Sequence, residues 1–186
     1  MKLIKIFIFL LISLVISTKA SSNEDLLNSL KEGGKLIFIR HAYAPGSGDP
    51  KNFDIEDCST QRNLNQEGKN QAKNIGLLFK QKNISIDYVI SSQWCRCKET
   101  ALIAFGDKYE TNSFLNSFYE ERFSNNKENH ILELKKYIDN WSGKKNLVFI
   151  THYVVISEVL NVYPSSGEIV ISDKNYNVIG NLNSVF

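Results

Sequence analysis

The sequence predicts a single α/β domain of three layers, α/β/α, with a mostly parallel central sheet. Two observations carry this prediction. Continuous apolar runs, such as residues 36–39 and 147–151, are typical of strands that are buried on both faces. Amphipathic helical patterns separate these runs, and strands that alternate with helices favour a parallel sheet. A chain of 186 residues is long enough for one such domain.

Each expected element has a local signal. Leucines at helical spacing predict a first helix that ends at Gly33-Gly34. Gly, Pro, Asp and Asn remove any periodicity between residues 41 and 62, which predicts a long loop. Ser92 is the expected cap of the helix that follows it. The full expected order is helix 23–31, strand 36–39, helix 65–82, strand 84–90, helix 93–105, a helix over 131–141, strand 147–151, a helix ending at 160, and a hairpin of strands 167–173 and 176–182.

The first twenty residues have the layout of an export signal. A basic start precedes an apolar run over 6–17, and Thr18-Lys19-Ala20 places small residues where a signal peptidase reads. An uncleaved membrane anchor is the weaker alternative, because a spanning helix needs ~20 apolar residues. We therefore expect a signal peptide at 1–20 and one domain at 21–186. The domain would be exported to the periplasm or the extracellular space, without a stable membrane anchor after cleavage.

The basic residues are unevenly distributed by position and by type. The formal charge of +2 depends on residues 1–20, which hold three Lys and no acid, so the remaining chain carries −1. A nearly neutral domain lacks the positive surface of nucleic-acid binders, and we expect no nucleic acid partner. Only four of the 22 basic residues are Arg, and the chain has three His. In a chain that uses Lys by default, the position of each Arg and His is informative.

The chain has three Cys, which is an odd number for an oxidising compartment. The simplest prediction is one disulfide and one free thiol, with Cys58 bonded to either Cys95 or Cys97. Such a bridge closes a loop of roughly 40 residues, for which chain entropy gives a stabilisation on the order of 3–4 kcal/mol. A zinc site is disfavoured because three thiols without a nearby His do not complete the usual four ligands, so no metal is expected.

Arg and His residues gather where the expected strands end. Arg40-His41 ends the first strand, residues 91–96 follow the second and include Arg96, and Thr151-His152 follow the later strand. The carboxyl ends of parallel strands meet at one edge of a sheet, and ligands bind beyond that edge in α/β folds. We therefore expect these side chains to converge on one site.

The residue types at that edge suit phosphoryl transfer. A phosphoryl group in transfer carries negative charge on its oxygens, and the planar guanidinium of Arg donates two aligned hydrogen bonds to them. A neutral imidazole can act as a nucleophile and form a phosphohistidine. The helix expected after Ser92 would add backbone N–H donors.

Each of these residues also has a structural alternative. Arg40-His41 could end a strand by bonding neighbouring carbonyls, and Arg96 could form a surface ion pair near Glu99. His152 could support the site residues without contacting the ligand, and Arg62 could be a solvated cation in the loop. Arg122 and His130 lie in a polar stretch and are interpreted as ordinary surface residues, whereas Trp94 and Trp141 are expected in the core or in a pocket wall.

Four segments, in order along the chain, resemble the signature elements of the histidine phosphatase superfamily, also called phosphoglycerate-mutase-like. Residues 38–42 are similar to its Arg-His-Gly/Ala signature, and residues 64–72 to its Leu-Thr-x-x-Gly-x-x-Gln-Ala helix start. Residues 91–101 resemble its Ser-Ser-x-x-x-Arg-x-x-x-Thr-Ala element, and residues 150–152 its later Gly-His element. The resemblance covers residues 36 to about 160 and implies a phosphoglycerate-mutase-like fold. Asn65 stands where the family has Thr, and Thr151 where it has Gly.

The resemblance implies a role for each matched residue. His41 would be the phosphorylated nucleophile, and Arg40, Arg96 and His152 would bind the phosphoryl group and stabilise its transition state. Arg62 would be a further substrate-binding residue. Neither a metal nor a cofactor is implied, and the expected partner is a small phosphorylated substrate.

The leaving oxygen needs a proton, which a carboxyl group usually supplies. Many family members use a Glu between the third and fourth elements. Glu121 is the expected catalytic acid, Glu120 is the adjacent candidate and is expected to bind substrate, and Asp49 is the reserve. We also expect the disulfide at Cys58 to hold two phosphate-binding segments together.

Three functions are compared. The first is an exported, metal-independent phosphatase, a phosphoric monoester hydrolase of the histidine acid type, that works through a phosphohistidine on His41. The second is a phosphoglycerate-type mutase, which export disfavours because glycolytic intermediates are cytoplasmic. The third is a non-catalytic binding protein for a phosphorylated ligand, which the complete set of Arg and His residues disfavours. The sequence does not name the substrate.

Overall fold

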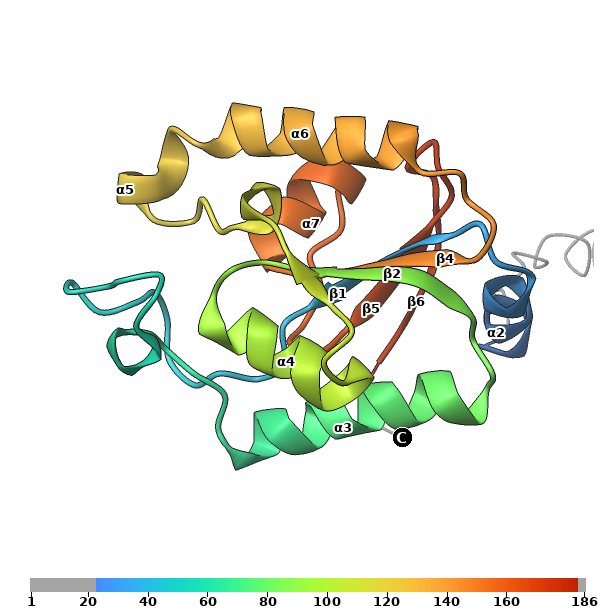
Figure 1. The fold of residues 1–186 in the computed structure, drawn as a ribbon, viewed down its shortest axis with the longest axis horizontal. Helices are drawn as coiled ribbons and strands as arrows, with labels where there is room; N and C mark the ends of the chain where they lie inside the picture. Colours follow the sequence, from blue (N-terminus) through green and yellow to red (C-terminus); the bar gives the residue numbers. More distant parts are fainter. Residues whose placement is uncertain (1–22, 184–186) are drawn as a thin grey trace, which may run out of the picture.

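The computed structural model describes residues 23–183, which form one sheet between two layers of helices (Figure 1). The expected export signal at 1–20 lies outside the described residues. The strands are β1 (Leu36–Arg40), β2 (Ile86–Ser91), β3 (Glu110–Thr111), β4 (Asn146–Thr151), β5 (Ile169–Ser172) and β6 (Val178–Leu182). The helices are α2 (Asn23–Glu32), α3 (Gln66–Gln81), α4 (Cys95–Phe105), α5 (Glu121–Ser124), α6 (Lys127–Asn140) and α7 (Tyr153–Leu160), with short 3-10 turns η1 (Cys58–Thr60) and η2 (Ser113–Leu115).

The sheet is mostly parallel, as the alternation of strands and helices predicts. Its strand order is β3-β2-β4-β1-β5-β6, and β3, β2, β4 and β1 run parallel to one another. The last two strands form the expected hairpin, in which β5 is antiparallel to both β1 and β6. The three-layer α/β prediction is therefore confirmed.

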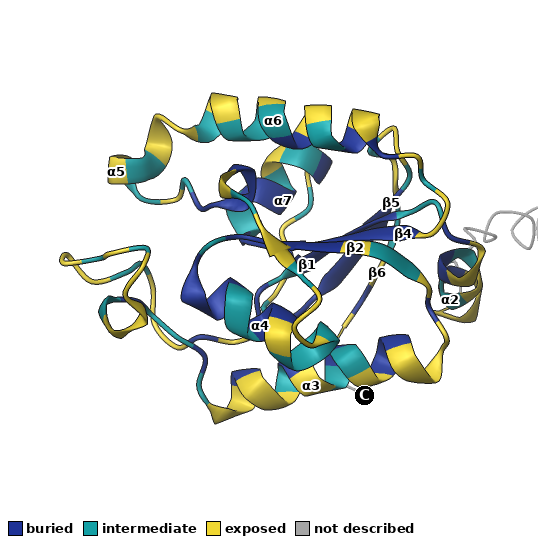
Figure 2. Ribbon diagram, in the orientation of Figure 1, coloured by how far each residue is buried: buried dark blue, intermediate teal, exposed yellow. Residues whose placement is uncertain are grey.

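The core lies on both faces of the sheet, which explains the uninterrupted apolar runs. Alternate residues of β1 point to opposite faces, so Ile37 and Ile39 pack with α2, α3 and α4. Leu36 and Phe38 pack with α6 and α7 on the other face. The central strands β1, β4 and β5 are buried along most of their length, whereas the edge strands β3 and β6 and the outer faces of the helices are more exposed (Figure 2).

The pairing of β1 with β4 sets the position of the two predicted site histidines. Arg40 is directly opposite Thr151, and the His41 N–H donates to the Thr151 carbonyl at 2.9 Å. His41 and His152 therefore leave neighbouring strands at the same level. The convergence expected from the strand ends is what the parallel register produces.

Helix α4 begins differently from the prediction. It begins at Cys95 rather than after Ser92, and its N-cap residue, Trp94, makes no side-chain cap bond. Gln61, from the loop between β1 and α3, accepts from the Cys95 N–H at 2.9 Å instead. The Ser92 cap was wrong, because a side chain distant in sequence supplies the acceptor.

The disulfide joins Cys58 to Cys95 and leaves Cys97 as a buried free thiol. The bridge links the loop between β1 and α3, called here the β1–α3 loop (residues 41–65), to the start of α4. It closes 37 residues, for which chain entropy gives about 4 kcal/mol. No helix within residues 23–183 has the length and apolar character needed to cross a bilayer.

Candidate active site

A small cavity of about 110 Å³ opens at the carboxyl edge of the sheet, below the β1–α3 loop. Six of the seven residues that the sequence predicts for the site line this cavity, and Glu121 does not. The full lining is Arg40, His41, Gly46, Ser47, Gly48, Asp49, Arg62, Trp94, Arg96, Ser117, Tyr119, Glu120, Phe123, His152 and Tyr153. The strand-end, helix-start and loop residues therefore meet at one place.

His41 is held in the tautomer that a nucleophile needs. Its Nδ1 lies 2.8 Å from the Ala42 carbonyl, which can only accept, so Nδ1 carries the proton. Its Nε2 accepts a hydrogen bond from Nε of Arg96 at 3.2 Å, so Nε2 is unprotonated and its lone pair is free for attack once this bond is released. The imidazole is 3% exposed and presents Nε2 to the cavity.

Thr100 fixes the backbone that carries this histidine. Its hydroxyl oxygen accepts from the Ala42 N–H at 3.1 Å and donates to the Arg96 carbonyl at 2.6 Å. Ala42 is thus bound on one side by Thr100 and on the other by the ring of His41. The Thr of the Arg-x-x-x-Thr-Ala element consequently positions the nucleophile without touching the cavity.

Both histidines of the cavity are held neutral. Burial, reinforced by the positive charge of Arg96, keeps the pKa of His41 well below its usual value. The same two causes lower the pKa of His152. The two rings meet edge to face with centroids 5.4 Å apart. His152 Nε2 lies 3.0 Å from the hydroxyl oxygen of Ser92, which fixes the ring from behind.

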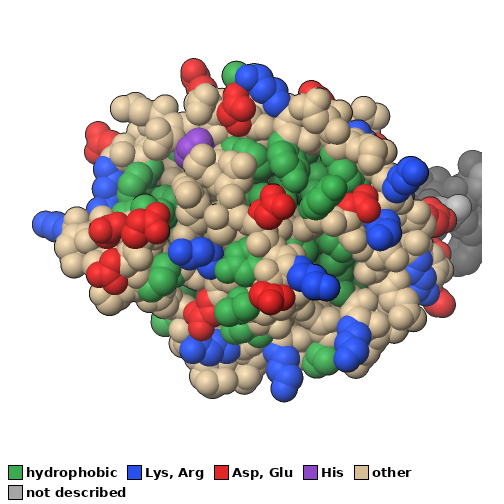
Figure 3. All heavy atoms as spheres, viewed as in Figure 1, with side chains coloured by type: hydrophobic (Ala, Val, Ile, Leu, Met, Phe, Trp, Pro, Cys, Tyr) green, Lys and Arg blue, Asp and Glu red, His purple; other side chains and the backbone are tan. Residues whose placement is uncertain are grey.

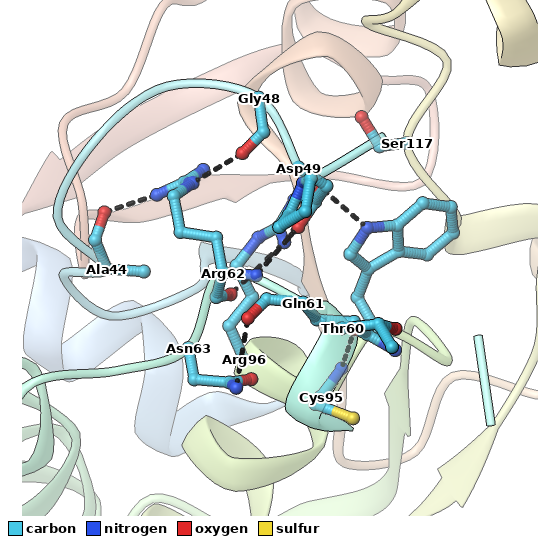
Figure 4. Close-up of polar contacts among 12 residues, drawn as sticks. Ala44, Gly48, Asp49, Thr60, Gln61, Arg62, Asn63, Cys95, Arg96 and Ser117 are labelled. Carbon is cyan, nitrogen blue, oxygen red and sulfur yellow. Dashed lines mark hydrogen bonds and ion pairs between the residues drawn. The ribbon is translucent and has the colours of Figure 1, made fainter. Parts of the chain in front are cut away.

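Three arginines surround the nucleophile from different elements. Arg40 donates to the Pro164 carbonyl at 2.8 Å, and its Nε is buried without a hydrogen-bond partner among the described residues. Arg62 donates to the carbonyls of Gly48 and Ala44 across the β1–α3 loop (Figure 4). Neither side chain is a solvated surface cation, and both line the cavity.

Arg96 is the most buried of the three and faces a carboxylate. Its Nη1 and Nη2 donate to both oxygens of Asp49 at 2.9–3.1 Å, as the dashed lines of Figure 4 show. Glu99, the partner in the surface alternative, pairs with Lys69 instead. Burial alone would raise the pKa of Asp49, but the bonds and charge of Arg96, with bonds from Arg62 and Trp94, lower it.

The comparison of the sequence with known protein families agrees with this geometry. The sequence profile of the histidine phosphatase superfamily (branch 1) matches residues 36–148 of the chain. The chain belongs to this superfamily. The matched residues include His41 and Arg96 but end before His152, so it is the structure that brings the second histidine to the superfamily site.

Solved structures of this superfamily's fold resemble the chain in three dimensions. One is the protein histidine phosphatase SixA complexed with tungstate, at 14% identity and a TM-score of 0.55, covering 81% of this chain and 97% of that one. Another is the alpha-ribazole phosphatase of Shigella flexneri, at 17% identity and a TM-score of 0.55, covering 75% and 90%. A phosphoglycerate mutase of Thermus thermophilus has 15% identity and a TM-score of 0.53, covering 80% and 98%. No curated protein matches the sequence.

The two candidate acids differ in position. Glu120 is extended, lines the cavity, and accepts from the Asp49 N–H at 2.8 Å. Glu121 is the first residue of α5, is exposed, and lies outside the cavity lining. The structure thus places the residue expected to bind substrate at the cavity and the expected catalytic acid away from it.

Arg122 is exposed at the surface, as the sequence predicts, but it also makes specific contacts with the loop. Its guanidinium forms an ion pair with Glu120 at 2.7 Å and donates to the carbonyls of Asp49, Pro50 and Lys51. It therefore ties α5 to the β1–α3 loop. The rarity of Arg in the sequence was the available signal, since all four Arg contact the cavity or this loop.

A second, open groove of about 740 Å³ adjoins the cavity. The two share the walls formed by Trp94, Ser117 and Phe123. Trp94 stacks on Phe53 with ring centroids 4.9 Å apart, which confirms it as a wall residue.

On the face shown in Figure 3, basic and acidic side chains are interspersed, and acidic ones gather at the left over the β1–α3 loop. Within residues 23–183, no three His, Cys, Asp or Glu side chains group as a metal site.

Proposed function

We propose that the protein is a phosphatase that hydrolyses a phosphomonoester through a phosphohistidine on His41. The observation that carries this proposal is the orientation of His41, whose proton lies on Nδ1 and whose unprotonated Nε2 accepts from Arg96, in a cavity that Arg40 and Arg62 also line. A neutral imidazole beside concentrated positive charge is suited to attack an anionic phosphorus. Membership of the histidine phosphatase superfamily supports the same reaction class.

The reaction is proposed in two displacements. The Nε2 lone pair of His41 forms a bond to phosphorus while the bond to the leaving oxygen breaks, and that oxygen takes a proton. Water then attacks the same phosphorus and gives a proton to the carboxylate that the first step left behind, the Nε2–phosphorus bond breaks, and inorganic phosphate leaves. Arg40, Arg62, Arg96 and His152 bind the phosphoryl oxygens in both steps.

We propose Glu120 as the proton donor to the leaving oxygen, because it lines the cavity and Glu121 does not. This role predicts a dependence on the leaving group. Glu120→Gln should lose about 100-fold or more in kcat on an alkyl phosphate, and much less on 4-nitrophenyl phosphate, whose leaving group needs little protonation. Glu121→Gln is the matched control and should behave as wild type on both substrates. Equal losses on the two substrates would remove Glu120 from the acid role.

The leaving group is proposed to occupy the adjoining groove. A cavity of about 110 Å³ accommodates little more than a phosphoryl group, whereas the groove of about 740 Å³ is in the range of small-molecule sites. Its aromatic and amide lining would accept an organic group with both apolar and hydrogen-bonding parts. This agrees with the expected small phosphorylated substrate.

Export is proposed on two grounds. The sequence begins with the layout of a signal peptide, and the Cys58–Cys95 bridge is of a kind that persists in oxidising compartments. Mass spectrometry of the N-terminus of the mature protein tests this, with cleavage expected after Ala20. An intact N-terminus in the purified exported protein would contradict cleavage.

The central experiment measures hydrolysis of 4-nitrophenyl phosphate with and without EDTA. Wild type should turn over equally in both, and His41→Ala should lose at least about 1000-fold in kcat. Rapid denaturation in alkaline detergent during turnover should trap a phosphoenzyme at His41 in wild type, because a phosphohistidine is stable in alkali and hydrolyses in acid. Turnover abolished by EDTA would overturn the metal-independent mechanism, and binding of phosphate without turnover of any phosphomonoester would favour the non-catalytic alternative.

A further inference from the structure

The carboxylate of Asp49 lies where a phosphoryl group would be bound by Arg96. The two side chains are 3% and 4% exposed, and Arg96 donates to both carboxylate oxygens. Oδ2 also accepts from the Trp94 indole N–H at 3.0 Å, and Oδ1 from the Arg62 backbone N–H at 2.9 Å. The Asp49 carboxylate is thus bound by donors from the β1–α3 loop and from residues just before and just after the first residue of α4.

The guanidinium of Arg96 also forms a hydrogen bond with the nucleophile, His41. Nε of Arg96 donates to Nε2 of His41 at 3.2 Å, while its Nη atoms donate to Asp49. A phosphorus atom attacked by that Nε2 has its oxygens beside the same guanidinium. Two anions that share one buried cation at this separation repel each other, so an incoming phosphoryl oxygen and the Asp49 carboxylate compete for Arg96.

The segment that carries Asp49 is tied to the protein by hydrogen bonds rather than by packing into the core. Residues 45–47 and 50–52 are exposed, and the flanking Gly46 and Gly48 have positive φ angles of 92° and 67°. Glu120 accepts from the Asp49 N–H at 2.8 Å, and Arg122 donates to its carbonyl at 3.3 Å. Retraction of the carboxylate therefore exposes no apolar core; its cost is loss of the bonds to Arg96, Arg62 and Trp94.

We propose that Asp49 is an intramolecular competitor for the phosphoryl site and determines which anions enter it. The proposal rests on the proposed phosphatase function and adds a selectivity device to it. A carboxylate on the chain has a high effective concentration at Arg96, so a free monoanion such as acetate cannot displace it. A phosphoryl dianion can, because its further oxygens also bind Arg40, Arg62 and His152.

The competitor lowers the apparent affinity for every anion. The dissociation constant rises in inverse proportion to the fraction of molecules in which Arg96 is available. Removing the negative charge at residue 49 should therefore strengthen phosphate binding and admit weaker anions. It should also lower stability until an anion binds, because Arg96 is then buried without a counter-ion.

The test compares wild type with Asp49→Asn, and uses Glu56→Gln as a control with the same charge change on an exposed residue of the same loop. Calorimetric titration with inorganic phosphate should show at least about tenfold tighter binding to Asp49→Asn, and wild-type affinity in Glu56→Gln. Acetate should compete with phosphate only in Asp49→Asn. Phosphate should also raise the melting temperature of Asp49→Asn more than that of wild type.

An unchanged or weaker phosphate affinity in folded Asp49→Asn would overturn the inference while leaving the phosphatase proposal intact. If phosphate binds to neither protein, the phosphatase proposal fails and the inference fails with it. A loss of kcat on alkyl phosphates without tighter phosphate binding would instead make Asp49 the proton donor, and would also overturn the inference.

A second measurement needs no variant and covers failure of Asp49→Asn to fold. The chain has two Trp indoles: Trp94 donates to Asp49, and Trp141 donates to Asp87 at 3.2 Å. Phosphate added to wild type should move the Trp94 indole proton resonance upfield, as expected for loss of its hydrogen bond, and leave that of Trp141 in place. A Trp94 resonance that stays hydrogen-bonded at phosphate saturation would overturn the inference.

Discussion

The cavity has two halves that are built in different ways. The strand half consists of the ends of β1 and β4, where His41 and His152 are positioned by the register of Arg40 against Thr151. The loop half consists of the β1–α3 loop, where Asp49 and Arg62 are positioned by a disulfide and by hydrogen bonds between distant side chains. The strand half is rigid because its backbone belongs to the sheet.

This difference separates the chemistry from the selection of the ligand. The nucleophile and its neutral partner histidine lie on the half that cannot move without disturbing the core. The anion competitor lies on the half whose backbone is at the surface. Variants of the strand half should therefore change kcat, and variants of the loop half should change KM, affinity for phosphate, and stability.

Among the variants that compare the two halves, the largest effect is expected at Arg96, which contacts both of them. Arg96→Ala removes a donor to the transferred phosphoryl group and leaves Asp49 buried without its cation. We expect a loss of about 10²–10³-fold in kcat and of about 3–5 kcal/mol in unfolding free energy. Kinetics with 4-nitrophenyl phosphate and urea unfolding measure the two. Lys98→Ala, which removes a cation from the same helix, is the control and should change neither greatly.

The disulfide tests the loop half alone. Cys58→Ser should lower the unfolding free energy by about 4 kcal/mol, because 37 residues are no longer closed into a loop. We expect KM to rise more than kcat falls, because Arg62 lies four residues from the lost bridge. Wild type in a strong reductant, and Cys95→Ser, should give the same melting temperature as Cys58→Ser. A melting temperature and activity equal to those of oxidised wild type would show that the bridge does not hold the loop half.

Thr100 tests the strand half alone. Thr100→Val preserves the shape of the side chain but removes the hydroxyl that accepts from the Ala42 N–H. The orientation of the Ala42 carbonyl, and with it that of the His41 ring, should become less defined. We expect kcat to fall about 10-fold or more while the affinity for inorganic phosphate changes little. A change in affinity with normal kcat would mean that Thr100 acts through Arg96 rather than through His41.

The positions of residues in the strand half could be predicted from the sequence, whereas those in the loop half could not, because the two halves are built differently. Apolar runs predict buried strands, and parallel strands bring their ends together, so the sequence alone places His41, Arg96 and His152 at one site. The Arg96–Asp49 pair joins residues 47 apart, and the Gln61 bond to the Cys95 N–H joins residues 34 apart. Asp49 lies in a segment without periodicity, where only tertiary contacts determine the conformation.

The sequence does not decide between Glu120 and Glu121 as the acid, or between Cys95 and Cys97 as the partner of Cys58. Each choice depends on the conformation of one local turn. Glu120 and Glu121 differ in position because the first is still extended and the second already begins α5. Cys95 and Cys97 are two residues apart on α4, so they point in different directions. Cys97 faces the core and is fully buried, and burial raises the pKa of its thiol to about 12. Cys95 faces the loop and forms the bridge.

The pH dependence of stability should also come from the strand half. The pKa values of His41 and His152 are lowered in the folded protein and are near 6.5 when the chain is unfolded. Below about pH 6.5 the unfolded chain therefore binds more protons, and stability falls as the pH falls. We expect a loss of about 1–2 kcal/mol per histidine between pH 7 and pH 5. Urea unfolding of His152→Asn should show a smaller decrease than wild type, the rest coming from His41 and from His130, whose pKa burial also lowers. A full decrease would assign the effect to other groups.

The smallest effect is expected where α3 leaves the loop half and enters the helical layer. Asn65 stands where the superfamily has Thr, and its side chain accepts from the Gly68 N–H at 2.9 Å, so either residue can cap the helix. Asn65→Ala should cost about 1 kcal/mol, and Asn65→Thr should keep the stability. Because the cap lies outside the cavity, kcat and phosphate affinity should stay at wild-type values in both variants. A loss of phosphate affinity in Asn65→Ala would show that the end of the loop half is set by the helix cap as well as by the disulfide.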